Sequence, residues 1–400
     1  MHKLIRAGVA ALMTTAAMSA LSVPAAAEPW PQGAPNAAFQ PAFAGQTRAP
    51  AIRSGITLRA EPVIEGLEHP WAVALLPGGG ALITERPGRL RIWQNGAAHE
   101  VAGIPNVAAG GQGGLLDVAL APDFDQSRVI YLSYAEPRDG GAGTSVARMV
   151  LAPDGRSVSN LQVIFRQHPA HTGNGHFGSR ILPAGDGTLF ITLGDRSDVA
   201  IRETTQDLDN HIGKLVRINP DGSVPQDNPY TTTAQAMPEI WARGLRNVQA
   251  AALDRAGQLW TIEHGPRGGD ELNLIRPGRN YGWPVISYGV NYSGSNINEG
   301  IAVHEGMEQP VYYWDPVIAP SGAAFYDGPL LADWRGDLLI GAMRPAGLVR
   351  LTLEGDRVTG EERFDPGIGR IRDVQIAPDG TIWVVTDESR GGLYRLSPAG

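Results

Sequence analysis

The sequence of 400 residues contains no cysteine. The chain therefore forms no disulfide bond and offers no thiolate to a metal, so its stability has to come from the packing of a large core. Positive charge is also scarce, because 33 Lys and Arg stand against 41 Asp and Glu, which gives a formal net charge of −8. Such an acidic balance argues against nucleic acid or an anionic membrane as the main partner.

Several common functional motifs are absent as well. The sequence has no HxH or HExxH pattern, and none of its nine histidines pairs at zinc spacing with a second ligand set. It also has no GxGxxG that follows a strand and opens a helix, and no GxSxG nucleophile elbow. These absences argue against a zinc centre, a Rossmann nicotinamide site and an α/β-hydrolase triad. Beyond the N-terminus no segment is apolar enough to span a bilayer, so we expect no membrane insertion.

The N-terminus has the layout of a secretory signal peptide. Two basic residues precede an apolar, alanine-rich run that ends in the small-residue pattern "PAAAE". We expect residues 1–27 to be removed by cleavage near Ala27 and the mature protein to be exported to the periplasm. Residues 28–55 are rich in Pro, Ala and Gly without periodicity, which predicts a flexible linker before a catalytic domain over residues 56–400.

One theme recurs through that domain: a turn with Gly or Asp, a short apolar strand, a polar bend and often a second strand. An apolar anchor marks each of six such units, at Leu82, Ile130, Leu189, Leu259, Leu338 and Ile382. Successive anchors lie about 44 to 79 residues apart, whereas a blade of four strands needs roughly 40–50 residues and the excess fits inserted loops. The sequence therefore predicts an all-β protein, a six-bladed β-propeller with four-stranded antiparallel blades, in preference to a pair of β-sandwiches.

Polar residues stand next to these strands in several units, and loops of different blades converge at one mouth of a propeller channel. The candidates are Gln112, His176, Asp195, Arg246, Asn247, Gly265, Pro266, Asp270, Glu271, Arg344, Arg370 and Arg372. Any one of them has an ordinary explanation as a turn, cap or edge residue. The four arginines, however, stand at corresponding ends of their units, and converging guanidinium groups would suit a polyanion. The loop "HGPRGGDE" is rich in oxygen ligands of the kind that Ca²⁺ prefers.

The chain also carries eight segments, in order, that resemble the soluble quinoprotein glucose/sorbosone dehydrogenase family, with its aldose sugar dehydrogenase branch as the best match. They are "GQGGLLDVALAPDF", "GHFGSRI", "LGDR", "GKLVRINPDGSVPQDNP", "GLRN", "EHGPRGGDELNLI", "NYGWP" and "RIRDV", and the resemblance covers about residues 60–396. It implies pyrroloquinoline quinone (PQQ) and Ca²⁺ as cofactors. The implied reaction oxidises C1 of an aldose to the lactone and passes electrons to a quinone or a cytochrome.

The resemblance implies a role for each candidate. His176 matches the base that takes the proton of the anomeric hydroxyl while hydride passes to the quinone, and Asp195 matches the carboxylate that orients this base. The remaining catalytic and cofactor positions match Arg246, Gln112, Asn247, Arg344, Arg370 and Arg372, of which the last two face the cofactor carboxylates. The metal positions match Gly265 and Pro266, whose carbonyls hold the Ca²⁺ that polarises the quinone, and Asp270, Glu271 and Tyr281 in a second calcium region.

Two positions depart from the family pattern. Gly175 stands where glucose-specialised members have an aspartate, and Arg344 stands where a lysine is expected. We therefore expect a site open to many aldoses, disaccharides included. Two alternatives remain: a Ca²⁺-dependent lactonase on a six-bladed propeller, which needs several side-chain ligands at the channel centre, and a non-catalytic carbohydrate-binding propeller, in which His176 would be dispensable.

Overall fold

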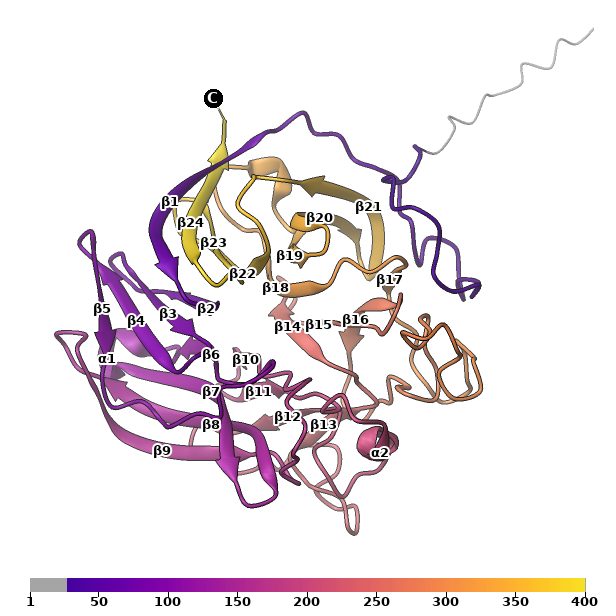
Figure 1. The fold of residues 1–400 in the computed structure, drawn as a ribbon, viewed down its shortest axis with the longest axis horizontal. Helices are drawn as coiled ribbons and strands as arrows, with labels where there is room; N and C mark the ends of the chain where they lie inside the picture. Colours follow the sequence, from indigo (N-terminus) through magenta and orange to yellow (C-terminus); the bar gives the residue numbers. More distant parts are fainter. Residues whose placement is uncertain (1–26, 400) are drawn as a thin grey trace, which may run out of the picture.

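The computed structural model describes residues 27–399, so the predicted signal peptide, apart from Ala27, lies outside the described residues. Within them, 24 strands form six four-stranded antiparallel sheets that surround a central channel (Figure 1). The predicted six-bladed propeller is confirmed. The innermost strands of neighbouring blades contact one another all the way round the ring.

Five blades are built from consecutive strands, numbered here from the innermost strand outward. Blade 1 contains β2 (Pro70–Leu75), β3 (Ala81–Glu85), β4 (Arg89–Gln94) and β5 (Ala97–Val101), and blade 2 contains β6 (Leu115–Leu120), β7 (Val129–Arg138), β8 (Gly141–Leu151) and β9 (Val158–Arg166). Blade 3 contains β10 (Ile181–Pro183), β11 (Leu189–Thr192), β12 (Lys214–Ile218) and β13 (Ile240–Arg243), and blade 4 contains β14 (Val248–Leu253), β15 (Leu259–Glu263), β16 (Asp270–Ile275) and β17 (Tyr312–Trp314). Blade 5 contains β18 (Pro320–Phe325), β19 (Leu338–Met343), β20 (Ala346–Glu354) and β21 (Arg357–Phe364).

Blade 6 closes the ring by joining the two ends of the chain. It contains β22 (Ile371–Ile376), β23 (Ile382–Thr386) and β24 (Gly391–Pro398), and its outermost strand is the N-terminal β1 (Leu58–Leu67). The antiparallel pairing runs from Leu58 opposite Pro398 to Leu67 opposite Gly391. Because the N-terminal strand β1 completes the sheet of the C-terminal strands, the first and last parts of the chain close the ring in one blade.

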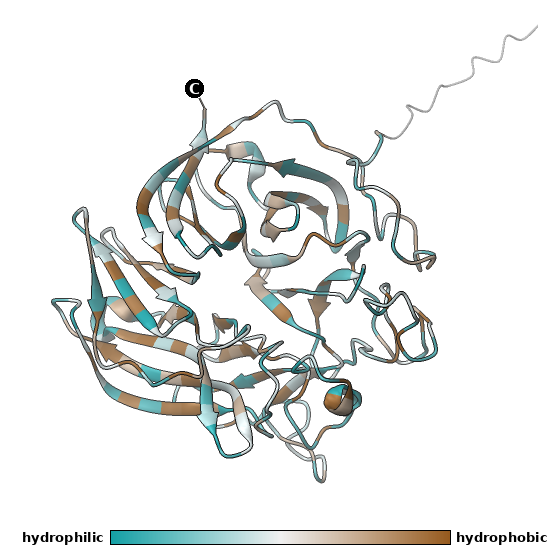
Figure 2. Cartoon of the chain, viewed as in Figure 1, coloured by the Kyte–Doolittle hydropathy of each residue, from teal (hydrophilic) through white to brown (hydrophobic). Residues whose placement is uncertain are grey.

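The core lies between the blades. Each of the six main apolar clusters joins residues of two neighbouring blades, so burial of apolar surface holds each blade to the next. Apolar and polar residues alternate along many strands (Figure 2), as expected for sheets that pack face to face. All six anchors recognised in the sequence lie on the second strand of a blade and are buried, which explains why they marked the repeat.

Short helical segments occupy the connections, namely α1 (Phe124–Ser127), α2 (Val199–Arg202), η1 (Glu203–Gln206) and η2 (Ala332–Trp334). None of the helices within residues 27–399 is long and apolar enough to cross a membrane. Residues 28–55, for which the sequence predicts a flexible linker, contain no strand but lie along the outer edges of blades 4 and 5 (Figure 1). Gln46 and Ala49 of this segment are buried.

Candidate active site

The candidate residues gather at one mouth of the channel for a simple topological reason. In each antiparallel blade the start of the innermost strand and the end of the second strand lie at the same end. Gln112, His176, Arg246, Asn247 and Arg370 directly precede or lie close before innermost strands, and Asp195, Gly265, Pro266 and Arg344 follow second strands. The sequence therefore brings residues of five blades to one rim.

His176 and Asp195 form a buried pair at this rim. The His176 Nδ1 atom lies 2.6 Å from Asp195 Oδ1. That oxygen also accepts the Ser197 N–H at 2.8 Å, and Oδ2 accepts the Trp283 indole N–H at 2.8 Å. Because an ionised carboxylate only accepts hydrogen bonds, the His176 proton is placed on Nδ1 and the lone pair on Nε2. Within residues 27–399 no partner hydrogen-bonds to that Nε2 atom.

The surroundings keep this pair in its neutral-imidazole, ionised-carboxylate form. Burial lowers the pKa of His176, and the nearby positive charge of Arg246 lowers it further. Burial alone would raise the pKa of Asp195, but the charge and hydrogen bond of His176, with Arg246 and the Ser197 N–H, hold that pKa below its ordinary value. An imidazole that is neutral and free at Nε2 is equipped to accept a proton.

Glycines fold the His176 loop tightly onto the segment that carries Asp195. A Cβ on Gly178 would lie 2.5 Å from the Leu193 backbone, and one on Gly175 would lie 2.9 Å from Ser197 Cβ. Gly178 also has φ +64°, a conformation that other residues adopt at a cost. These glycines thus permit close contact between two chain segments, which is what brings His176 within hydrogen-bond distance of Asp195.

Two amide side chains present N–H donors at the rim. The Gln112 Oε1 atom accepts the His176 backbone N–H at 2.8 Å, and the Asn247 Oδ1 atom accepts from Gly178 N at 3.2 Å and Gln249 Nε2 at 3.0 Å. With their oxygens engaged in this way, both side chains direct their NH₂ groups to other partners. They are suited to bind carbonyl or carboxylate oxygens of a ligand.

Arg246 lies beside the pair and is fixed by the loop after β15. Its Nη1 atom donates to the carbonyls of His264 at 2.9 Å and Gly265 at 2.7 Å, while the buried Nε atom has no hydrogen-bond partner within the described residues. Glu263, which the sequence did not single out, accepts the backbone N–H groups of Arg246 and Asn247. Burial raises the pKa of Glu263 to about 7.

A second group of positive charges lies across the rim on blades 1 and 6. Arg372 is buried beside Trp71, and its Nε atom has no partner within the described residues. Arg86 follows β3 and has the same kind of buried, unpaired Nε, and it lies 3.7 Å from Asp387, which is 3.9 Å from Arg370. Burial lowers the pKa of Arg372 to about 10 despite the charge of Asp387. Three guanidinium groups thus share one carboxylate, which leaves positive charge unmatched.

Arg344 and Arg370 are the more exposed of the predicted arginines. Arg344 is exposed and its backbone N–H donates to the Ile318 carbonyl at 3.0 Å. The residue before it, Met343, accepts weak contacts at 3.3–3.4 Å from Arg370 and Arg372. The structure therefore places all three predicted arginines of blades 5 and 6 on one side of the mouth.

The predicted metal residues divide into two groups. Gly265, Pro266 and Asp270 form the first group, at the loop after β15. The Pro266 carbonyl accepts no hydrogen bond from residues 27–399, whereas the Gly265 carbonyl accepts a hydrogen bond from Arg246 Nη1. Asp270 holds the loop itself, because its oxygens accept the backbone N–H groups of Gly265, Ile318 and Ala319, each at 2.8 Å.

The other two predicted metal residues, Glu271 and Tyr281, line a small cavity together with Gly265 and Pro266. The Tyr281 hydroxyl bonds to the backbone of Leu274 and Arg276, and the Glu271 carboxylate contacts Asn273 at 3.4 Å. Burial and the neighbouring Glu263 raise the pKa of Glu271 well above its ordinary value. In the part of the chain that the structure describes, no three His, Asp or Glu side chains are placed together to hold a metal ion.

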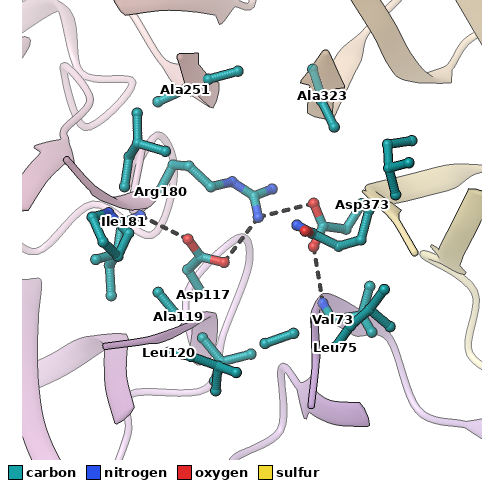
Figure 3. Close-up of a pocket in the computed structure, with 18 of the residues that line it drawn as sticks. Val73, Leu75, Asp117, Ala119, Leu120, Arg180, Ile181, Ala251, Ala323 and Asp373 are labelled. Carbon is teal, nitrogen blue, oxygen red and sulfur yellow. Dashed lines mark hydrogen bonds and ion pairs between the residues drawn. The ribbon is translucent and has the colours of Figure 1, made fainter. Parts of the chain in front are cut away.

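The middle of the channel is closed by an ion triad. Arg180 Nη1 bonds Asp117 at 2.9 Å and Asp373 at 3.0 Å, and these carboxylates also accept the backbone N–H groups of Ile181 and Val73 (Figure 3). Burial raises the pKa of Asp117 to about 7. Beyond the triad, a cavity of about 830 Å³ opens toward the opposite mouth and is lined mainly by apolar residues of the inner strands. The triad thus separates that cavity from the candidate site.

The structure defines a six-bladed β-propeller with a buried His–Asp pair and hydrogen-bond donors at one mouth of its channel. Comparisons with known proteins identify the family. The family profile described as Glucose / Sorbosone dehydrogenase matches residues 67–395, and the chain belongs to this family. The resemblance recognised in the sequence is confirmed, and with it the prediction of a dehydrogenase family.

Individual relatives agree with this assignment. The chain is 46% identical to the aldose sugar dehydrogenase YliI of Escherichia coli over 86% of this chain and 93% of that protein. The apo-form crystal structure of the soluble aldose sugar dehydrogenase of Escherichia coli matches with a TM-score of 0.82, covering 86% of this chain and 100% of that one at 46% identity. The PQQ-bound aldose sugar dehydrogenase of Streptomyces coelicolor matches with a TM-score of 0.72 at 27% identity, covering 87% and 100%.

Proposed function

We propose that the protein is a periplasmic, PQQ- and Ca²⁺-dependent aldose dehydrogenase that oxidises C1 of aldose sugars to the lactone. The observation that carries the proposal is the arrangement of one hydrogen-bond acceptor and several hydrogen-bond donors at the rim. Within the described residues, His176 offers an acceptor without a partner at Nε2, while Arg246 beside it and Arg86 and Arg372 across the rim offer buried donors without partners. The names of the relatives support a sugar substrate and a quinone cofactor.

His176 is the proposed general base. Its Nε2 atom would take the proton of the anomeric hydroxyl, and Asp195 would stabilise the imidazolium that results. Trp283 and Ser197 hold the carboxylate, so the ring keeps one orientation through the reaction. A correctly placed base of this kind contributes about 10²- to 10⁴-fold in rate.

The orphaned donors fit a planar polycarboxylate such as PQQ. Arg86, Arg246 and Arg372 each have a buried Nε without a partner in the described residues, and a buried donor left unpaired costs about 1–3 kcal/mol. We propose that these groups, with Arg344, Arg370 and the amides of Gln112 and Asn247, hold the cofactor oxygens. When bound, PQQ supplies the two-electron acceptor for the hydride of C1.

The metal would lie at the loop after β15. The Gly265 and Pro266 carbonyls are the proposed ligands, and the nearby Glu271 carboxylate offers further oxygen atoms. Asp270 accepts one backbone N–H of this loop, that of Gly265, and two from Ile318 and Ala319 before β18. It is proposed to act on the metal through loop shape. The Tyr281 hydroxyl is used by the backbone, so its contribution to a second calcium region would come through its carbonyl.

The test is reconstitution of purified protein with PQQ and Ca²⁺. We expect dye-linked oxidation of aldoses to appear only when both are added, and a panel of mono- and disaccharides would give the specificity. No gain with any aldose would contradict the proposal. If activity appears, the physiological electron acceptor is identified by replacing the dye with a quinone or a cytochrome.

The two alternatives predict different results in the same assay. A lactonase would hydrolyse sugar lactones with Ca²⁺ alone and would need several free carboxylates at the channel centre, but Asp117 and Asp373 are both paired with Arg180. A non-catalytic carbohydrate-binding propeller would bind sugars without turnover and without PQQ. The unpaired arginine donors at the rim favour the dehydrogenase.

A further inference from the structure

The N-terminal segment 28–55, named here the strap, lies outside the part of the chain that the family profile matches. Figure 1 shows this indigo segment running from β1 past the outer edge of blade 5 to the side of β17. It contains no strand of its own within the described residues, yet isolated bridges connect Pro29 to Pro50 and Ala51 to Glu361 of β21. Its length and composition alone gave no sign of these contacts.

Buried contacts fix the strap on blades 4 and 5. Gln46 is fully buried; its Nε2 atom donates to the Pro310 carbonyl at 2.9 Å and its Oε1 atom accepts the Tyr288 hydroxyl at 3.0 Å. The Trp30 indole N–H donates to the Glu361 carbonyl at 2.6 Å. Phe39 packs edge-on against Tyr288 at 6.5 Å between ring centroids. These contacts offset the entropy of ordering a segment that is rich in Gly and Pro.

One strap residue reaches the loop that carries the proposed metal ligands. Asn36 donates to the Asp315 carboxylate from its backbone N–H at 2.8 Å and from Nδ2 at 2.7 Å, and its Oδ1 atom accepts Arg267 Nε at 3.1 Å. The Ala37 N–H completes the cap of Asp315 at 2.9 Å. Asn36 thus ties the outer end of blade 4 to Arg267, the residue that follows Pro266.

The Asp315 carboxylate also lies close to the backbone of the 264–269 loop. A Cβ at Gly268 would lie 2.7 Å from Asp315 Oδ1, so the loop backbone passes directly under this carboxylate. The Gly269 N–H donates to the Trp314 carbonyl at 2.9 Å, and Arg267 pairs with Val290 on the other side. The loop from 264 to 269 is therefore held by Trp314 and Asp315 at the end of blade 4 and by the strap residue Asn36, which bonds both Asp315 and Arg267.

We propose that Asn36 and Asp315 are positioning residues, through which the strap holds the 264–269 loop in the shape that binds the metal and cofactor. This inference rests on the proposed function for the identity of the ligands. The contact of the strap with the loop does not depend on them. Loss of the Asn36 side chain should loosen the loop and weaken cofactor binding about tenfold, with little change in kcat once the cofactor is saturating.

The test compares Asn36→Ala with Ser54→Ala. Ser54 is the matched control, because it also anchors the strap through a side-chain bond, from Oγ to Glu362 Oε1 at 2.7 Å, but on blade 5 and away from the loop. Hydrogen–deuterium exchange of the peptide covering residues 264–269, in protein without cofactor, measures loop opening. Titration with PQQ at fixed Ca²⁺ measures affinity, and dye-linked turnover at saturating PQQ measures kcat.

We expect Asn36→Ala, and not Ser54→Ala, to exchange several-fold faster over residues 264–269 and to need about tenfold more PQQ for half-saturation. Unchanged exchange in Asn36→Ala would overturn the positioning role. Faster exchange with unchanged PQQ affinity would overturn the link to cofactor binding. If the wild-type protein bound no PQQ, the proposed function would fail, while the exchange result would still decide whether the strap holds the loop.

Discussion

His176 Nδ1 and Asp195 Oδ1 lie 2.6 Å apart, and this contact assigns the free lone pair of the imidazole to Nε2. The two residues are brought together by a loop before β10 and a turn after β11, which pack closely because Gly178 leaves room for the Leu193 backbone. The geometry is that of a base with its orienting carboxylate.

Asp195→Asn should abolish most turnover while leaving cofactor binding intact. Both oxygens of Asp195 accept N–H donors, Oδ1 from His176 and Ser197 and Oδ2 from Trp283, but an asparagine amide has only one oxygen and no charge. The variant therefore loses part of the contacts that orient the imidazole, together with the negative charge that stabilises the imidazolium. We expect kcat to fall by about 10²- to 10⁴-fold, measured in the dye-linked assay. Asp198→Asn is the control, since Asp198 pairs with His171 at 2.8 Å on the exposed side of the same region; an equal loss in both variants would contradict the assignment.

The pH profile of the wild-type enzyme should reflect the lowered pKa of His176. Burial and Arg246 favour the neutral imidazole, so the base stays competent as the pH falls through the ordinary histidine value of about 6.5. We expect kcat/KM to stay flat through that value and to decline only at lower pH. An acidic limb centred at or above that value would show that His176 is not the titrating base.

Arg180→Met should destabilise the fold, and more so at higher pH. Removal of the cation leaves Asp117 and Asp373 buried without their ion-pair partner, which costs about 3–5 kcal/mol when they are charged. Both carboxyls would remain protonated in the folded state but ionise in the unfolded chain above about pH 4, so the free energy of unfolding falls as the pH rises. Urea unfolding at pH 5 and pH 8 measures this difference.

The control for that experiment is Arg217→Met. Arg217 is equally buried, but its partners Asp186 and Asp227 are largely exposed at 52% and 73%, so water solvates them when the cation is lost. We expect a similar loss of stability at both pH values for this variant. A pH-independent loss in Arg180→Met would contradict the buried-triad account.

Gly178→Ala should disturb the site through the backbone. The new Cβ would meet the Leu193 backbone at 2.5 Å in a residue with φ +64°, a combination expected to cost about 1–3 kcal/mol. Because the loop carries His176, we expect kcat and the melting temperature to fall together. Gly185→Ala is the matched control, as no atom lies within 4 Å of its Cβ position; equal effects would show that the close packing is unimportant.

The propeller was accessible from the sequence because its signal is local and repeated. Each blade buries its second strand, so Leu82, Ile130 and their counterparts recur as apolar anchors beside Gly or Asp turns. The closing pair of β1 with β24 is different, since it joins residues more than 300 positions apart and no local pattern announces it. The contacts of the strap escaped prediction for the same reason, because a segment rich in Pro and Gly reads as a linker until its partners are known.

The site was accessible in part. His176, Asp195 and Arg246 stood out because polar residues follow or precede apolar strands at the same end of each blade. Glu263 and Trp283 did not, because they contact other parts of the protein rather than open space. Only the folded structure shows that Glu263 accepts the backbone N–H of Arg246 and that the Trp283 indole donates to Asp195. The carboxylate of Asp270 resembled a metal ligand in the sequence, yet both its oxygens accept backbone N–H groups.

The most direct test of the account is to measure PQQ binding and aldose turnover together in His176→Asn. We predict that this variant binds PQQ and Ca²⁺ with nearly wild-type affinity, since the unpaired donors belong to other residues, and that its kcat falls by about 10²-fold or more. His171→Asn, which alters the histidine of the half-buried pair with Asp198, should retain turnover. Wild-type turnover in His176→Asn would contradict the central claim that His176 is the catalytic base.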